Sequence, residues 1–389
     1  MIRQNKINFF IWSIILILLS LAIYLSFIGG YGSDEDTLPM IYVFESKLYS
    51  GKFVSSRFTG NPVAEIGIGF LSYFFGSIVT NITTFLLFVL GLIIFYFCLS
   101  NKKNINLFLL LCFSSPVLFF DNLEPVDYSW AFFFYVLGLF FFKKKLVELS
   151  ILFFALSIGV RINFFLFIIF TIFFFDIKNL EFTIKRRISI IFCTFFIGSL
   201  FYLPVWYDSK FQLYWLTAGR PIDEGFLGLV SRFLYKSFYA FGGISAIIIL
   251  YGFIKKKNFL SDNNILFILS LVLSNLLLFF WIPAELSYLQ PAIIFIYYIV
   301  IKYFDFKIII ILICVNFMSW IFNPQFLNIK YMSDDICEPK HAIDAEFKFT
   351  IQEGYFNKFL TSRDLIKCWA QGDSERSQRI RSGLPLRSK

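Results

Sequence analysis

Long apolar runs recur along most of the chain, and they constrain the fold more than any other feature. A helix needs roughly 20 apolar residues to cross the hydrocarbon core of a bilayer. The 389 residues are 58% hydrophobic and only 16% charged, whereas soluble domains are about 25% charged. A soluble domain could not bury the side chains of 57 Phe together with the other apolar residues, but lipid would solvate them. This composition excludes a soluble enzyme, a nucleic-acid-binding protein and a disordered scaffold.

The sequence predicts an all-α polytopic membrane protein with about eleven transmembrane helices. The predicted spans are 9–29, 77–99, 105–121, 128–142, 146–159, 163–175, 188–205, 237–254, 264–281, 291–303 and 306–323. Residues 1–323 form the predicted membrane domain, and residues 324–389 form a small tail. Arg161 interrupts the stretch 146–175, and a helical hairpin with Arg161 at its tip keeps the charge near an interface, where its cost is lowest.

The lysine and arginine residues predict the orientation. The predicted loops on one side contain sixteen basic residues and five acidic ones, whereas those on the other side contain eight basic and twelve acidic residues. Cytoplasmic loops carry the excess of Lys and Arg. We therefore expect a multi-pass protein of the cytoplasmic membrane with a cytoplasmic N-terminus and an outward-facing tail. The first span is long and lacks a small-residue cleavage site, which favours a retained helix over a signal peptide. The net charge of +9 fits loops that anchor beside anionic lipid.

The cysteines divide between the spans and the tail. Cys98, Cys112, Cys193 and Cys314 lie within predicted spans, where a free thiol behaves as a small apolar group. Cys337 and Cys368 lie in the outward tail, and an oxidising exterior would allow them to form a disulfide.

Three adjacent acidic residues follow the first span. Asp34, Glu35 and Asp36 begin the first outward loop, residues 30–76. Acidic residues can simply mark an outward loop, but three neighbouring carboxylates at a membrane surface repel one another unless they bind a cation or a basic partner. Later in this loop, the segment from Pro62 to Phe75 is apolar and too short to form a span of its own, which is typical of a helix that lies along the interface.

The spacing in this loop resembles that of a known enzyme superfamily. Asp36 lies fifteen positions before Gly51, a turn follows from Ser56 to Pro62, and Phe75-Gly76 ends the loop. The pattern is similar to the first outward loop of the GT-C glycosyltransferases, the superfamily of aminoarabinose and protein-mannosyl transferases. The resemblance implies a GT-C-like fold and an inverting transfer of a sugar from a polyprenyl-phosphate donor at the outer face of the membrane. The acceptor would be a cell-envelope glycan or a lipid such as lipopolysaccharide.

Three later segments extend the resemblance over residues 1–320. Leu123 to Asp127 is similar to the family's second outward loop, Ser157 to Arg161 resembles its Gly-x-Arg element, and Ile282 to Pro291 resembles its late Arg-Tyr-Leu-x-Pro turn. In this last segment Ser287 stands where the family has Arg. A phosphate contact expected at that position is therefore not implied here.

The resemblance and the chemistry together assign candidate roles. No histidine lies in the first outward loop, so a carboxylate has to take the proton of the acceptor hydroxyl. Its spacing favours Asp36 as this base, with Asp34 as the second candidate. Outward arginines would bind the donor phosphate, although each also fits an interfacial anchor. The candidate substrate-binding residues are Glu35, Arg57, Asp127, Arg161, Arg220, Arg232, Glu285 and Tyr288.

A divalent cation such as Mg²⁺ or Mn²⁺ is a further candidate, because hard cations prefer oxygen ligands. Asp34, Asp36 and Asp127 would be its ligands. Some members of the resembled family need a metal and others do not, so both options stay open.

Two other functions fit parts of the sequence. A repeat-unit polymerase or ligase of O-antigen or capsule would share the size and the outward loops, and Arg232 and Gly243 match its Arg-x10-Gly element. A flippase or transporter would instead place charges or broken helices at mid-membrane depth. The acidic residues directly after the first span favour the glycosyltransferase.

The predicted orientation can be tested with reporter fusions. Alkaline phosphatase, which is active only outside the cytoplasm, should be active when fused after Lys389 and inactive when fused after Lys257. The opposite pattern would reverse the topology and place the first outward loop on the wrong side of the membrane for the proposed donor.

Overall fold

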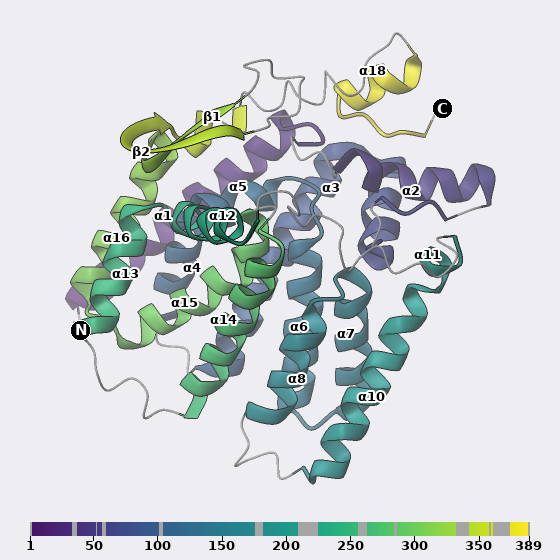
Figure 1. Cartoon of the computed structure of the whole chain (residues 1–389), viewed down its shortest axis with the longest axis horizontal. Coiled ribbons are helices and arrows are strands. Elements are labelled where there is room, and N and C mark those ends of the chain that lie inside the picture. Colours follow the sequence, from purple (N-terminus) through teal and green to yellow (C-terminus); the bar gives the residue numbers. More distant parts are fainter. Residues whose placement is uncertain are drawn as a thin grey trace.

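The computed structural model is almost entirely helical, with a small strand pair near the C-terminal end (Figure 1). It describes residues 2–32, 37–51, 53–56, 60–100, 104–175, 182–208, 225–255, 263–283, 286–331, 342–357, 359–360 and 374–387. The first half contains α1 (Ile2–Ile28), α2 (Thr37–Ser50), α3 (Pro62–Leu99), α4 (Ile105–Ser114), α5 (Pro116–Phe120), α6 (Tyr128–Lys143), α7 (Val147–Val160), α8 (Phe164–Phe174) and α10 (Ile184–Phe201). The second half contains α11 (Leu203–Asp208), α12 (Gly225–Ala240), α13 (Ile244–Lys255), α14 (Asn263–Trp281), α15 (Gln290–Tyr303), α16 (Phe306–Ile321) and α18 (Glu375–Arg381). The chain also contains two short 3-10 helices, η2 (Asp121–Leu123) and η6 (Leu286–Leu289).

Fewer helices than predicted are long enough to cross a membrane. Within the described residues four helices qualify by length and hydropathy, or six if each of two bent helix pairs forms one span. The helices α6, α7, α8 and α16 are apolar but contain only 11 to 16 residues. At 1.5 Å per residue they cover about 17–24 Å, which is less than the hydrocarbon thickness of about 30 Å. The membrane character of the chain stands, but eleven full-length spans are not confirmed.

Two of the predicted spans are sharply bent. The predicted span 105–121 divides into α4 and α5, and the chain turns by 91° between them. Pro116 begins α5, and proline has no amide hydrogen with which to continue the preceding helix. The predicted span 237–254 likewise divides between α12 and α13, which are bent by 89°. Gly242 and Gly243 lie at this break with φ of +77° and +59°, a conformation that glycine adopts without steric cost.

The predicted hairpin around Arg161 is confirmed. Helix α7 ends at Val160, Arg161 is extended, and α8 begins at Phe164.

The helices α6 and α7 pack closely, and hydroxyl groups join them: Ser150 Oγ donates to the Gly138 carbonyl at 3.0 Å, and Ser157 Oγ donates to the Ala131 carbonyl at 2.9 Å. Such small polar contacts are typical of helix packing in membranes, where burial of apolar surface gives little association energy.

The first outward loop ends at a break in α3. Gly76 has φ +79° and ψ −174°, which is not helical, whereas residues on both sides belong to α3. The sequence predicts an interfacial helix up to Phe75 and a span from residue 77, and the interruption falls between them. The helix up to Phe75 and the span nevertheless join in one element of 38 residues.

The tail contains strands, which corrects the all-helical prediction. The strands β1 (Phe322–Tyr331) and β2 (Ala342–Glu353) form an antiparallel pair directly after α16. Figure 1 shows this pair and α18 at the same end of the molecule as α2. The predicted disulfide partners Cys337 and Cys368 lie outside the described residues, and the sequence pattern alone therefore supports that pairing.

The C-terminal segment 382–387 packs against the break at Gly76. An interrupted helix leaves amide and carbonyl groups without their usual partners, which is costly where water is scarce. The tail supplies new ones through three bonds: Ser77 N to Gly383 O (3.0 Å), Leu386 N to Ser72 O (3.3 Å) and Arg387 N to Tyr73 O (3.0 Å). The hydroxyl of Tyr31 also donates to Leu384 O of the tail, at 2.9 Å. Burial raises the pKa of Tyr31, so its hydroxyl remains a donor at any physiological pH.

Gly383→Val should loosen this contact. Gly383 has φ +65°, and a Cβ atom there would lie 2.4 Å from Ser77 Oγ. Backbone strain of about 1–2 kcal/mol, together with this clash, should lower the thermal unfolding midpoint in detergent by several degrees. Ser382→Val, at an exposed neighbour with ordinary φ, should leave the midpoint almost unchanged. Equal midpoints for the two variants would show that the tail contact does not stabilise the fold.

Candidate functional site

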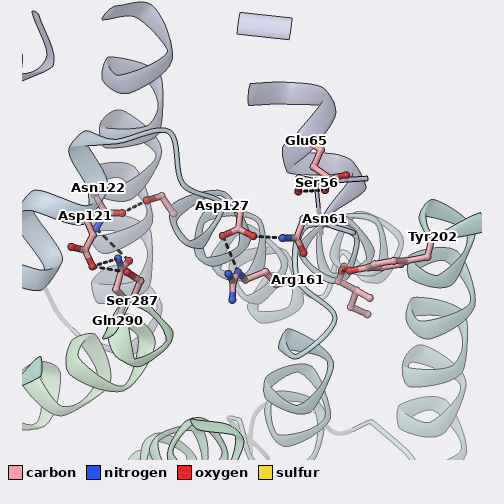
Figure 2. Close-up of polar contacts among 12 residues, drawn as sticks. Ser56, Asn61, Glu65, Asp121, Asn122, Asp127, Arg161, Tyr202, Ser287 and Gln290 are labelled. Carbon is pink, nitrogen blue, oxygen red and sulfur yellow. Dashed lines mark hydrogen bonds and ion pairs between the residues drawn. The ribbon is translucent and has the colours of Figure 1, made fainter. Parts of the chain in front are cut away.

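Buried polar side chains gather at one end of the bundle, where four separate parts of the chain meet (Figure 2). We call Asn61, Asp127, Tyr128, Arg161 and Tyr288 the Arg161 cluster. They come from the residue before α3, the start of α6, the end of α7 and η6. A charged side chain in such an apolar chain has to be paired with other groups of the protein. The partners of each charged residue therefore indicate which segments it holds together.

An ion pair lies at the centre of the cluster. Arg161 Nε lies 2.9 Å from Asp127 Oδ1, and the two side chains are only 5% and 0% exposed. Asn61 Nδ2 donates to the other carboxylate oxygen, Oδ2, at 2.6 Å. Both oxygens of Asp127 are therefore engaged, and the carboxylate joins the start of α3 to the end of α7.

Two tyrosine rings enclose the guanidinium group. Arg161 Cζ lies 3.5 Å from the centroid of Tyr128 and 4.8 Å from that of Tyr288. The rings are perpendicular, with centroids 5.6 Å apart and an interplanar angle of 89°. A cation over an aromatic face gains about 0.5–2 kcal/mol, with the larger values at sites without water. Arg161 thus holds η6 against the ends of α6 and α7.

A buried carboxyl group lies next to the cluster on α3. Glu65 has no exposed surface, and its Oε1 accepts hydrogen bonds from the Ser56 hydroxyl and from the Ser56 amide, the latter at 2.8 Å. Glu65 lies one helical turn after Asn61, and its amide donates to the Asn61 carbonyl at 2.9 Å. The predicted turn from Ser56 to Pro62 is thus fixed at both ends beside Asp127.

A second polar group links η2 to η6 and α15. Ser287 Oγ donates to Asp121 Oδ2 at 2.7 Å, and Gln290 Nε2 lies 3.4 Å from the same oxygen. Asn122 Nδ2 lies 3.3 Å from Gln290 Oε1. Ser287 occupies the position where the resembled family has Arg, and here it donates to a carboxylate. Ser287 thus makes its contact within the protein.

Glu124 approaches the end of the first span. Gly32 has φ +85°, and a Cβ atom on it would lie 2.6 Å from Glu124 Cδ. Glu124 is only 6% exposed. The turn before α6 therefore lies against Gly32, which is two positions before Asp34 in the sequence.

The structure brings three of the predicted site residues together. Asp127, Arg161 and Tyr288 meet in the Arg161 cluster, although they are up to 161 positions apart in the sequence. Arg232 lies half-buried on α12. The remaining candidates fall outside the described residues: Asp34, Glu35, Asp36, Arg57, Arg220 and Glu285.

Asp127, one of the predicted metal ligands, already has protein partners. Arg161 and Asn61 contact its two oxygens, so a cation there would share this carboxylate with the guanidinium. No group of three His, Cys, Asp or Glu side chains suited to a metal occurs among the residues described. A cation held by Asp34 and Asp36 stays a prediction.

Several polar residues in and beside the Arg161 cluster were not among the site residues predicted from the sequence. Asn61 and Glu124 stand inside segments that carry the resemblance, but their type gives no role by itself. Glu65 lies in an apolar helix, Asp121 at the end of a predicted span, and Gln290 before Pro291. An isolated carboxylate or amide in an apolar run is a usable signal, because burial of such a group requires a partner.

A pocket rich in hydroxyl groups opens beside Ser56. Its volume is ≈ 650 Å³, within the range of about 300–1,000 Å³ that is typical of ligand sites. It lies between α2, residues 54–56 and the start of α18. The polar residues that line it are Tyr42, Glu45, Ser46, Tyr49, Ser50, Ser55, Ser56 and Ser377. Tyrosine rings and hydroxyl groups give this pocket both apolar faces and hydrogen-bonding groups.

Comparison of the chain with protein-family models, with curated proteins and with solved structures gives no match.

Removal of one partner of the central ion pair should be strongly destabilising. Asp127→Asn leaves the Arg161 guanidinium buried without its counter-charge, which costs about 3–5 kcal/mol in buried pairs. Unfolding in mixed SDS micelles would measure the loss. Glu375→Gln, which removes the exposed partner of Arg379, should cost at most about 1 kcal/mol.

The double variant Asp127→Leu/Arg161→Met removes both charges and should unfold less readily than Asp127→Asn. If Asp127→Asn were as stable as Glu375→Gln, the ion pair would not organise this end of the bundle.

Proposed function

We propose that this chain is a membrane glycosyltransferase of the GT-C type. It transfers a sugar from a polyprenyl-phosphate donor to a glycan or glycolipid of the cell envelope, on the outer face of the cytoplasmic membrane. One observation carries the proposal furthest. The segments 56–62, 123–127, 157–161 and 282–291 carry the resemblance, and residues from all four meet at Arg161 through the contacts of Asn61, Asp127 and Tyr288.

In this proposal Asp36 is the general base. The acceptor hydroxyl attacks the anomeric carbon, its proton passes to the Asp36 carboxylate, and the bond from that carbon to the phosphate oxygen breaks. The products are the inverted glycoside and the polyprenyl phosphate. Asp34 and Glu35 are the other acidic residues of this segment, and Glu124, which lies against Gly32, is a further carboxylate of the proposed site.

The leaving phosphate needs cationic partners, because developing charge on its oxygens has to be offset. Arg57 and Arg220 are the proposed partners, with Arg232 as a further candidate on α12. Arg161 is engaged by Asp127 and two tyrosine rings. We therefore assign Arg161 the role of positioning the turn before α6 and the η6 turn, rather than that of the principal phosphate ligand.

The hydroxyl-rich pocket supports a carbohydrate substrate. It lies beside Ser56, which is bound to Glu65 next to Asn61, so the pocket and the Arg161 cluster share one connected polar framework. Glu285 and the loop containing Arg220 complete the proposed substrate-binding residues.

Asp36→Asn is the central test. The substitution keeps the shape of the side chain but removes its basicity, and loss of a general base typically lowers a rate by 10²–10⁴-fold. In cells that lack the chromosomal gene, mass spectrometry of the envelope glycans should show no sugar addition by Asp36→Asn at normal protein abundance. Asp34→Asn should be milder unless the two residues share a metal.

Asp305→Asn provides a matched control, because Asp305 precedes α16 at the opposite end of the bundle. It should transfer sugar normally. Normal transfer by Asp36→Asn in properly inserted protein would overturn the proposed mechanism. Glycans with altered repeat number but unchanged composition would instead indicate the polymerase.

A further inference from the structure

A second pocket lies at the opposite end of the bundle from the Arg161 cluster. Helix α6 begins at Tyr128, in the cluster, and ends at Lys143, in this pocket. The pocket has a volume of ≈ 450 Å³ and lies between the ends of α3, α6 and α15 and the residue before α4. We call it the lysine pocket. Its polar lining is Tyr96, Ser100, Asn104, Lys143, Tyr298 and Lys302.

Protein contacts hold both lysines at the pocket. Lys143 Nζ donates to the Cys98 carbonyl at 2.6 Å, near the end of α3. Lys302 Nζ lies 5.9 Å from the ring centroid of Tyr298 and 5.4 Å from that of Tyr303. An ammonium group has three hydrogen-bond donors, so the bond from Lys143 to Cys98 uses one of them. Two cations that line one pocket favour an anion in it.

The sequence next to the lining residues is rich in lysine. Lys102 and Lys103 stand in the sequence between α3 and α4, Lys144 and Lys145 follow Lys143, and the first acidic residue after Lys302 is Asp305. The first amides of α4 lie directly after Asn104, and the N-terminus of a helix carries positive partial charge. Cations and amide donors together are the groups that bind phosphate.

The remaining lining is apolar, and this distinguishes a lipid from a free anion. Phe97, Leu99 and Ile301 form this side, and Phe97 is 40% exposed. A site with cations on one side and an exposed apolar wall on the other matches a molecule that joins a phosphate to acyl chains. Basic pockets between membrane helices commonly bind lipid headgroups on the cytoplasmic side, and the lysine excess predicts that this end faces the cytoplasm.

We propose that the lysine pocket binds the phosphate headgroup of an anionic phospholipid, with Lys143 and Lys302 as its cationic ligands. The bound lipid joins the ends of α3, α6 and α15 and stabilises the lysine-rich end of the bundle. This binding is independent of sugar transfer, because the pocket and the Arg161 cluster lie at opposite ends of α6.

Lipid binding can be measured on the purified full-length protein by native mass spectrometry and by thermal unfolding in lipid nanodiscs. The probes are phosphatidylglycerol, phosphatidylcholine and inorganic phosphate. The unaltered protein should retain phosphatidylglycerol, and this lipid should raise its unfolding midpoint above that in phosphatidylcholine. Lys143→Gln/Lys302→Gln should reduce retention about tenfold and abolish the difference between the two lipids.

Two variants keep the test specific. Lys255→Gln/Lys307→Gln removes the same charge from exposed positions of α13 and α16 outside the pocket, and it should retain the lipid. Lys143→Arg keeps both the charge and a donor for Cys98, and it should also retain the lipid. Equal loss in the Lys255/Lys307 variant would show that general surface charge attracts the lipid, and equal protection by inorganic phosphate would show an anion site without lipid preference. Either result would overturn the proposal.

Discussion

The buried ion pair of Arg161 and Asp127 is the interaction on which the organised end of the bundle depends. Neither charge is stable alone in an apolar surrounding, so each fixes the other, and Asn61 takes the remaining carboxylate oxygen. The guanidinium in turn holds the rings of Tyr128 and Tyr288. These contacts hold four separate segments of the chain in fixed positions relative to one another. The same physical requirement explains why the cluster is polar and yet buried: a charge in such a protein has to be satisfied by other parts of the protein.

Broken helices impose a related requirement on the backbone. The break at Gly76 leaves amide and carbonyl groups unsatisfied within α3, and the segment 382–387 supplies their partners from the other end of the chain. The C-terminal segment therefore belongs to the membrane domain in an energetic sense, although its sequence reads as a separate polar tail. The breaks at Pro116 and at Gly242-Gly243 arise from the same local chemistry, since proline lacks an amide and glycine tolerates positive φ.

Much of the local structure was predictable from the sequence, because local chemistry decides it. The helices on both sides of Arg161 and the interruption at Gly76 follow from one charge and one glycine in apolar surroundings. The number of full-length spans was not predictable, because hydropathy reports whether a segment is apolar and not whether lipid or protein surrounds it. Helix α4 is apolar and buried among other helices, and the chain bends by 91° after it. The strand pair was missed although apolar and polar residues alternate from Ile343 to Gln352, a period of two that indicates a strand.

The sequence by itself determined that the chain is a helical membrane protein with its acidic residues gathered in a few loops, because composition and hydropathy act residue by residue. It also placed Asp127, Arg161 and Tyr288 among the candidates. Only the tertiary structure decided that these three meet, that Ser287 faces a carboxylate, and that Asp127 serves as a counter-ion. Partner choice depends on distances between segments more than a hundred positions apart, and no local pattern encodes such distances. The lysines at the opposite end show the same division: their number was readable, but the pocket between them exists only where three helix ends converge.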